Sequence, residues 1–478
     1  MGKSIDKAIK AFAKTAMRQL EEIYLDLLYT VASSIASYDD FTEVIGVTHK
    51  KGHAFLQRIV EELFEQTDQK YAEDRPDKSE IIITHSRSKK TITTIIGPVE
   101  LNRNRYLNKN TKEGYYFIDE LYNIDAHQRI DKGLQAKLIE EVTNSSYRKT
   151  SAIYNDLVSH QSVYNVTKRG YESYLEVVQN EQEIERSDCL NIYIEADEDH
   201  VHMKDRSNKI AKLIYVHEGY KNETLAENGS PRYKIVNAKY FTEREGQDIW
   251  EDVHDYVMAR YKRYAHVMIS GDGASWIKRG LQYFPLAEFN LDRFHIMQTA
   301  TRLFPRHKDK RAELINALIV KDRDYLISLY ERRYKRTPNP TSLKTQNTMR
   351  GLAYLINNLD NINLTEFHKK CSAEGHISHV LSARFSSRPQ AWTREGLERL
   401  AMFRCERYNK FDFTQLFKDT GRTELSEACE SIKYFIQEKK NSLKCKNTRK
   451  NFTRVNPCIV HGINPHRGEE TEKLKNLL

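Results

Sequence analysis

HVMISGDGASWIKRGLQYFPLAEFNLDRFH, residues 266–295, contains two short apolar segments that are each followed by a carboxylate. The first, Val267–Ser270, predicts a strand, and Asp272 follows it between two glycines that allow close approach of a substrate. The second, Leu286–Leu291, predicts another strand and leads to Asp292 and His295. A carboxylate at the carboxyl end of a buried strand is where α/β enzymes place their chemistry. An equally simple interpretation is that Asp272 caps the following helix.

Two other stretches carry acidic residues in a similar setting. LNIYIEADEDHVHMK, residues 190–204, predicts a strand with Asp197, and CSAEGHISHVLSARFSSRPQAW, residues 371–392, predicts a helix with Glu374. The order Asp, Asp, Glu resembles the DDE transposases, in particular the ISLre-type insertion-sequence transposases, which are relatives of the Mutator-like group. The motifs IEADEDHV, GDGASWIK, DRFH and EGHISHVLSARFSSRP carry this resemblance, which spans about residues 81–404. The DRFH motif resembles the Asp form of a signature that follows the second Asp in the Mutator-like relatives.

The resemblance implies an α/β fold, an RNase H-like catalytic domain that an all-helical insertion interrupts between its second and third acids. It implies DNA cleavage and strand transfer by Asp197, Asp272 and Glu374, which act as catalytic residues and metal ligands. Asp292 and His295 are expected to support that site. The implied partners are double-stranded DNA at transposon terminal inverted repeats, target DNA, and further copies of the chain in a dimer or higher oligomer.

Three carboxylates suit this chemistry because two Mg²⁺ or Mn²⁺ ions activate the attacking oxygen and stabilise the leaving oxygen. Mg²⁺ prefers hard oxygen ligands and keeps several waters, so one or two carboxylates serve each ion. Clustered anions are costly without a cation to offset their repulsion. Asp199 and, more weakly, Glu195 compete with Asp197 for the place of first ligand, because all three share one face of the predicted strand.

Composition and charge set limits on the class of protein. The chain has 478 residues, 30% of them charged, and a net charge of +9 that fits a polyanionic partner. It has neither a long uncharged apolar run nor a secretory pattern, so we expect a cytoplasmic, nucleoid-associated bacterial protein without a membrane span. The six cysteines lack CxxC pairs and are expected to be reduced thiols. A less favoured alternative is a zinc site built from Cys429, Cys445, Cys458 and His461.

Seven regions are expected along the chain. They are an N-terminal helical region (1–78), a small β region (79–130), a helix-turn-helix-like DNA-binding region (131–180), the first part of the catalytic core (190–298), an all-helical insertion (299–364), the last helix of the core (365–405) and a basic C-terminal region (406–478). The core should contain strands at 190–199, 209–216, 232–241, 267–270 and 286–291, with a helix at 246–261. An apolar stripe in the first region indicates either a helix packed within its own domain or a self-association helix. Residues 68–78 are polar, contain a proline and predict a linker.

Residues 133–171 predict three short helices, the first with an apolar face formed by Leu134, Leu138 and Val142. The third is expected at 161–169 with Ser159 as its N-cap, and it has the polar surface of a recognition helix. Basic residues bind phosphates and amides contact base edges. The candidate DNA-binding residues of this helix are Gln161, Tyr164, Asn165, Lys168 and Arg169. Alternatively, the three helices brace the catalytic domain. Arg384 and Arg388 are further candidates for phosphate binding, with pairing to surface acids as their alternative.

Two other functions compete with a transposase. A zinc-dependent hydrolase or nuclease would use imidazoles from His200, His202, His376 and His379, although the first two lie on the strand face opposite to Asp197. A DNA-binding protein with a derelict catalytic core is the other alternative, and the presence of all three acids argues against it.

Overall fold

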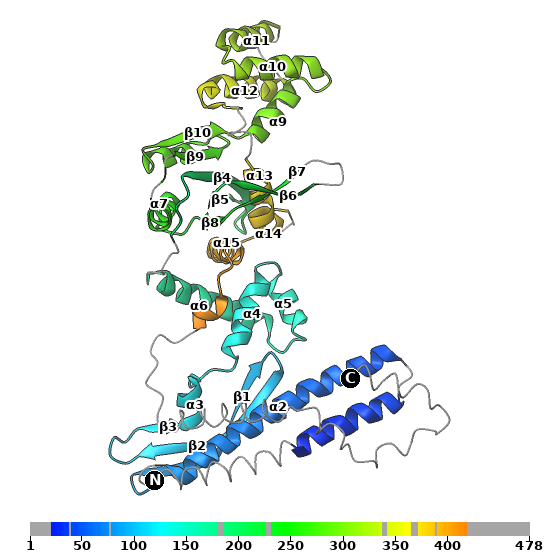
Figure 1. The fold of residues 1–478 in the computed structure, drawn as a ribbon, viewed down its shortest axis with the longest axis vertical. Coiled ribbons are helices and arrows are strands. Elements are labelled where there is room, and N and C mark those ends of the chain that lie inside the picture. The colour runs from blue at the N-terminus through cyan, green and yellow to red at the C-terminus, as the bar shows by residue number, and fades with distance from the viewer. Residues whose placement is uncertain are drawn as a thin grey trace. The chain divides into compact units, whose positions relative to one another are not determined.

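The computed structural model forms a mixed α/β protein with helices and several sheets (Figure 1). It describes residues 21–37, 40–75, 78–179, 186–225, 231–262, 264, 266–336, 342–364, 371–387 and 390–417. The chain divides into two compact units, Met1–Arg129 with Asp419–Leu478, and Ile130–Lys418. Within the described residues, no helix combines the length and the hydropathy needed to cross a bilayer.

The first unit combines long helices with a small sheet. Residues 21–37 are helical, and α2 (Phe41–Asp74) follows with Asp40 as its N-cap. Strands β1 (Ile81–Thr94) and β2 (Gly97–Asn108) form the predicted antiparallel hairpin, and the unpredicted short strand β3 (Gly114–Tyr116) pairs with β2. A short helix, α3 (Phe117–Tyr122), completes the unit.

Helix α2 continues through the segment where a linker was predicted, so that boundary was placed too early. Asp68 is buried in this helix and accepts hydrogen bonds from the backbone of Asn104 and the hydroxyl of Tyr106. These contacts with β2 stabilise the last turns of α2 in spite of their polar sequence. The first part of the predicted apolar stripe, from Ile5 to Leu20, lies outside the described residues.

The second unit begins with the three predicted helices α4 (Lys132–Val142), α5 (Tyr147–Ile153) and α6 (His160–Gln179). The predicted apolar face of α4, formed by Leu134, Leu138 and Val142, is fully buried. Ser159 acts as the expected cap by accepting the backbone N–H of Ser162, but α6 extends ten residues beyond its predicted end at residue 169. Helix α15 (Arg394–Tyr408) packs on α4 and on the edge of the central sheet.

The central sheet has five strands in the order β10-β9-β4-β5-β8. Strands β4 (Asn191–His202), β5 (Asn208–His217) and β8 (Lys239–Thr242) are antiparallel neighbours. Strands β9 (His266–Gly271) and β10 (Ala287–Leu291) run parallel to β4, and α7 (Ile249–Arg260) connects β8 to β9. The predicted third strand at 232–241 is instead two strands, because β7 (Pro231–Ile235) pairs outside this sheet with β6 (Tyr220–Leu225).

Alternate residues of the central strands face two separate hydrophobic cores. On β5, Leu213 and Tyr215 belong to the core shared with α4, α6 and α15, whereas Ile214 and Val216 face α7 and the helices that follow β10. This period of two is what a sheet covered on both faces requires.

The remaining helices fall on either side of the sheet. Four helices follow β10 and lie together beyond it (Figure 1): α9 (Arg293–Leu303), α10 (Lys308–Ile319), α11 (Arg323–Arg336) and α12 (Leu343–Asn357). The chain then returns to β4 through α13 (Ala373–Ile377), which continues as a π-helical segment, η4 (Ser378–Ser382), and α14 (Ala383–Phe385). The predicted helix that carries Glu374 therefore forms, over Ala373–Phe385 and with an irregular middle turn.

Candidate metal centre

Three parallel strands bring carboxylates to one end of the sheet, with Asp197 inside β4 and with Asp272 and Asp292 just after β9 and β10. The register of β4 with β9 pairs Glu195 with Ser270, and two residues further on each chain are Asp197 and Asp272. On β10, Leu291 pairs with Gly271, so that Asp292 follows at the same edge and donates its backbone N–H to the carbonyl of Gly271. The carboxyl ends of parallel strands meet because the strands run in one direction.

Helices α9 and α13 complete the cluster. Asp197, His295 and Glu374 each present a ligand atom, and these three atoms lie within 4.8 Å of one another. His295 is in the first turn of α9, and Glu374 is in the first turn of α13. The structure thus brings together two predicted ligands and one predicted supporting residue.

Asp197 is the buried member of the cluster. Its Oδ1 accepts the backbone N–H of Glu198 at 2.8 Å, while its Oδ2 is buried without a hydrogen-bond partner among the described residues. Burial raises the pKa of Asp197, and the negative charges of Glu374, Asp272 and Asp292 add to this, so that the pKa reaches about 7 in spite of the opposing backbone hydrogen bond from Glu198. A buried carboxylate oxygen that lacks a donor and is surrounded by other anions is suited to a cation.

Asp272 lies beside this group of three and not within it. Its Oδ1 accepts the backbone N–H of Ala274 at 2.9 Å, which is the capping contact of the simpler interpretation. Its carbonyl oxygen accepts the hydroxyl of Tyr354 from α12 at 2.7 Å. Gly273 has a φ of +87°, which favours glycine, and its position beside Asn358 leaves little room for a side chain. The loop that carries Asp272 is therefore held by the helices that follow β10.

Asp292 caps α9 by accepting the backbone N–H of Phe294 at 3.0 Å, and its Oδ2 lies 3.9 Å from Nε2 of His295. Burial raises the pKa of Asp292, and the backbone hydrogen bond and His295 oppose that rise. A carboxylate beside an imidazole orients the ring. Asp292 thus lies beside the imidazole of His295, which presents a ligand atom to the cluster.

The donor set fits a divalent cation. Two carboxylates and one imidazole suit Mn²⁺, Zn²⁺ or Mg²⁺, with carboxylates in excess favouring the harder ions. Asp197, Glu374 and His295 would hold the ion, and the unpartnered Oδ2 of Asp197 is the observation that supports its presence. Asp272 would complete the site from the adjacent loop.

Glu195 has a role that the sequence did not indicate. It is fully buried, and its carboxylate is surrounded by donors from His217, Tyr215, Tyr220 and Ser372. Burial alone would raise its pKa, but these hydrogen bonds outweigh burial and lower the pKa to about 2. Glu195 is therefore committed to internal contacts and is not a rival first ligand. Tyr215 and His217 alternate with the apolar Ile214 and Val216 on β5, and this polar face of a buried strand was the available signal.

The other predicted alternatives lie apart from the cluster. Asp199 accepts the hydroxyl of Ser386 and is not in the group of three. Among the described residues, none of the four histidines proposed for a zinc site belongs to a group that could hold a metal. His376 contacts the hydroxyl of Tyr240 instead. Cys429, Cys445, Cys458, His461 and the basic C-terminal segment lie outside the described residues.

The candidate DNA-binding residues of α6 divide into two groups. Gln161, Asn165, Lys168 and Arg169 are exposed, as expected, although Arg169 also donates to Gln135. Tyr164 was expected at the surface but is half-buried, because its ring packs edge-on against Tyr147. That part of the predicted recognition surface is corrected.

Arg384 is buried, so its predicted phosphate contact is wrong. Its guanidinium donates to the carbonyl oxygen of Ser145 at 3.0 Å and to Oε1 of Gln390 at 2.9 Å, and it lies over the ring of Trp392. These contacts fasten α14 to the turn between α4 and α5. Arg388 lies outside the described residues.

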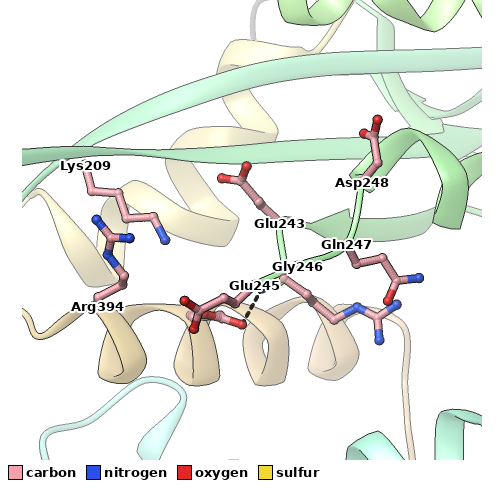
Figure 2. Close-up of a pocket in the computed structure, with 9 residues that line it drawn as sticks. Lys209, Glu243, Glu245, Gly246, Gln247, Asp248 and Arg394 are labelled. Atoms are coloured by element: carbon pink, nitrogen blue, oxygen red, sulfur yellow. Dashed lines mark hydrogen bonds between the residues drawn. The ribbon is translucent and has the colours of Figure 1, made fainter.

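A separate polar pocket lies beside the amino end of α15, and Figure 2 shows its lining. Lys209, Arg244 and Arg394 alternate there with four carboxylates, and Glu398 accepts the backbone N–H of Glu245 at 2.7 Å. Several of these charges pair with side chains outside the lining, as Arg244 does with Asp252 and Asp248 with Arg279, and no residue of the acidic cluster lines this pocket.

The fold and the cluster define an α/β protein with an acidic centre at the carboxyl edge of its central sheet. The family described as "Uncharacterised protein family (UPF0236)" matches residues 39–419, and the chain belongs to this family. It is 31% identical over 451 residues to a UPF0236 protein of Caldanaerobacter subterraneus subsp. tengcongensis, across 89% of this chain and 91% of that protein. UPF0236 protein TTE2489 of the same organism is 30% identical over 450 residues, across 89% and 92%.

The names of these relatives show that the family occurs repeatedly in one genome. The first relative's name joins eleven TTE designations, and that of another, 30% identical over 450 residues, joins four. Multiple copies in one genome are compatible with a mobile element.

Proposed function

We propose that this chain is a DDE transposase, which cleaves DNA at the ends of an insertion sequence and joins those ends to target DNA. The main support for this proposal is that Asp197, Glu374 and His295 converge. They do so at the edge of the sheet where Asp272 and Asp292 also lie. These residues come from positions far apart in the chain, and the proposed chemistry requires them at one place.

The strand order supports an RNase H-like catalytic domain. Three antiparallel strands followed by a helix and two parallel strands, with the first strand in the centre, is the arrangement the resemblance implies. Helices α9–α12 stand between the second acid and Glu374, where the resemblance implies a helical insertion. Their contact with the Asp272 loop through Tyr354 gives this layer a supporting role at the site.

The acidic cluster is suited to phosphoryl transfer. Bound Mg²⁺ or Mn²⁺, in a pair, would supply Lewis acidity for the attacking and leaving oxygens of a phosphodiester. Asp197 and Glu374 would hold the ions, and Asp292 would orient His295 toward them. Asp272 is positioned by its own capping contact to approach from the neighbouring strand. The net charge of +9 and the exposed polar face of α6 suit double-stranded DNA as the partner.

The test is cleavage of a plasmid that carries the gene for this chain with its flanking DNA. The purified protein should nick or cut that DNA at the ends of the element with Mg²⁺ or Mn²⁺. Asp197→Asn should abolish cleavage and retain DNA binding in a gel-shift assay. Cleavage by that variant at the wild-type rate contradicts the assignment.

The same assay separates the competing functions. A zinc-dependent nuclease would be active with Zn²⁺ and would lose activity when His200 and His376 are replaced, which a DDE transposase would tolerate better. A DNA-binding protein with a derelict core would bind the DNA and cut it with none of these ions.

A further inference from the structure

Beneath the acidic cluster, a buried carboxylate joins the central strand to the helix that carries Glu374. Glu195 lies on β4 two residues before Asp197, and its Oε2 accepts the backbone N–H of Ser372 at 2.7 Å. Ser372 is the N-cap residue of α13, and Glu374 follows two residues later. Two residues of helix span only about 3 Å, so the contact at Ser372 restricts where the Glu374 side chain begins.

The other donors to Glu195 come from β5, from β6 and from Cys371, whose Sγ donates to Oε2 at 3.4 Å. His217 on β5 donates through Nε2 at 3.1 Å, and Tyr215 on β5 and Tyr220 on β6 donate through their hydroxyls. The hydroxyl of Ser372 adds a further contact at 3.3 Å. A fully buried charge is stable only when it is surrounded by donors in this way, and removal of the charge leaves those donors unpaired.

Glu195 lies at the point where the chain returns from the helical layer to the sheet, at the start of α13. Residues 359–361 end the helical layer, and α13 begins after a segment that lies outside the described residues. Within the described residues, the amino end of α13 makes its hydrogen bonds to the sheet through Ser372 and the adjacent Cys371, and these reach Glu195 or its tyrosine partners. None of the donors belongs to the group formed by Asp197, His295 and Glu374.

We propose that Glu195 is a positioning residue, which holds the amino end of α13 on β4 so that Glu374 and Asp197 can share one cation. The inference rests on the proposed function, because it assumes that these two carboxylates bind a metal. Glu195 acts through Glu374 and does not touch the metal. Orienting groups of this kind commonly change metal affinity about 10- to 100-fold.

The experiment is a double-mutant cycle read by Mn²⁺ affinity, measured on the full chain by isothermal titration calorimetry. Glu195→Gln keeps the size of the side chain and removes its charge, and it should weaken Mn²⁺ binding at least tenfold. In a Glu374→Ala background, Glu195→Gln should cause no further loss, because the residue it positions is gone. A merely structural role would instead weaken both backgrounds equally, and that result overturns the proposal.

Two additional variants keep the test decisive if Glu195→Gln folds poorly. Tyr220→Phe removes one donor and retains the carboxylate, so it should weaken Mn²⁺ binding in the wild-type background and have no effect in Glu374→Ala. Glu198→Gln is the matched control on the same strand, because the Glu198 carboxylate accepts a hydrogen bond from Trp276 and lies outside the network around Glu195. The Mn²⁺ affinity of this control should equal that of the wild type. Wild-type affinity in both Glu195→Gln and Tyr220→Phe refutes the positioning role alone. A wild-type chain that binds no Mn²⁺ refutes the proposed metal centre as well.

Discussion

Replacement of Asp197 by asparagine should stabilise the metal-free protein even though it removes a proposed catalytic residue. Asp197 is only 7% exposed and its neighbours are carboxylates. Asparagine has the same shape, can still accept the backbone N–H of Glu198, and carries no charge. The repulsion and the burial of charge that the wild-type protein tolerates are therefore absent in the variant.

The size of the effect follows from the pKa of Asp197. The unfolded chain releases this proton near pH 3.8, whereas the folded protein keeps it until about pH 7. The folded state therefore binds more protons in this window, and its free energy of unfolding falls as the pH rises. At ~1.4 kcal/mol for each pH unit, the loss amounts to about 4 kcal/mol by pH 8.

Urea denaturation followed by tryptophan fluorescence measures this effect, because Trp250, Trp276 and Trp392 all lie in the second unit. At pH 8 without metal, Asp197→Asn should raise the free energy of unfolding by about 2–4 kcal/mol, and the gain should vanish near pH 4. Added Mn²⁺ should stabilise the wild type and leave the variant unchanged. Asp199→Asn is the matched control and should show a much smaller gain.

An Asp197→Asn variant that is no more stable than the wild type at pH 8 would refute the reasoning. So would a pH dependence that the substitution leaves intact. Either result would mean that the neighbouring carboxylates do not crowd Asp197 in the folded protein.

Three further predictions concern the surroundings of the site. Arg404→Met removes a buried guanidinium that donates to carbonyl oxygens at the end of α4 and in η4. The substitution should lower the free energy of unfolding by about 3 kcal/mol or more. A smaller loss in urea titration contradicts this prediction. Gly280→Ala brings a methyl group against a tryptophan ring and should cost about 1–3 kcal/mol, whereas Gly375→Ala meets open space and should be neutral or slightly stabilising by calorimetry. Equal melting temperatures for the two glycine variants would argue against the packing. Tyr354→Phe frees the carbonyl of Asp272 and should weaken Mn²⁺ binding about tenfold, and unchanged affinity would show that this loop needs no support.

Local pattern predicted most of the regular elements. The alternation on β4 and β5, the caps at Ser159 and Asp272, and the amphipathic helices all depend on neighbours within a few residues. The strand at 232–241 was wrong because both of its halves favour extended structure, and the pairing partners that divide it are set by tertiary contacts.

At the site too, some features were predictable from the sequence and others depended on tertiary contacts. The acidic residues at strand ends were visible as sequence, and Asp197 and Glu374 do converge. His295 lies within ligand distance of these two residues, whereas Asp272 lies beside them. This difference depends on the direction in which α9 leaves β10.

The sequence by itself determined where the strands and helices form and which carboxylates follow the strands, because periodicity and capping are local. The tertiary structure decided which polar side chains are available. Arg384 is held below the surface by a hydrogen bond to a carbonyl 239 positions earlier in the chain, and the charge of Glu195 is stabilised by donors from β5, β6 and the start of α13. The fold determines which partner a long or buried polar side chain bonds to. Because that partner is often far away in the sequence, the contact cannot be predicted from local pattern.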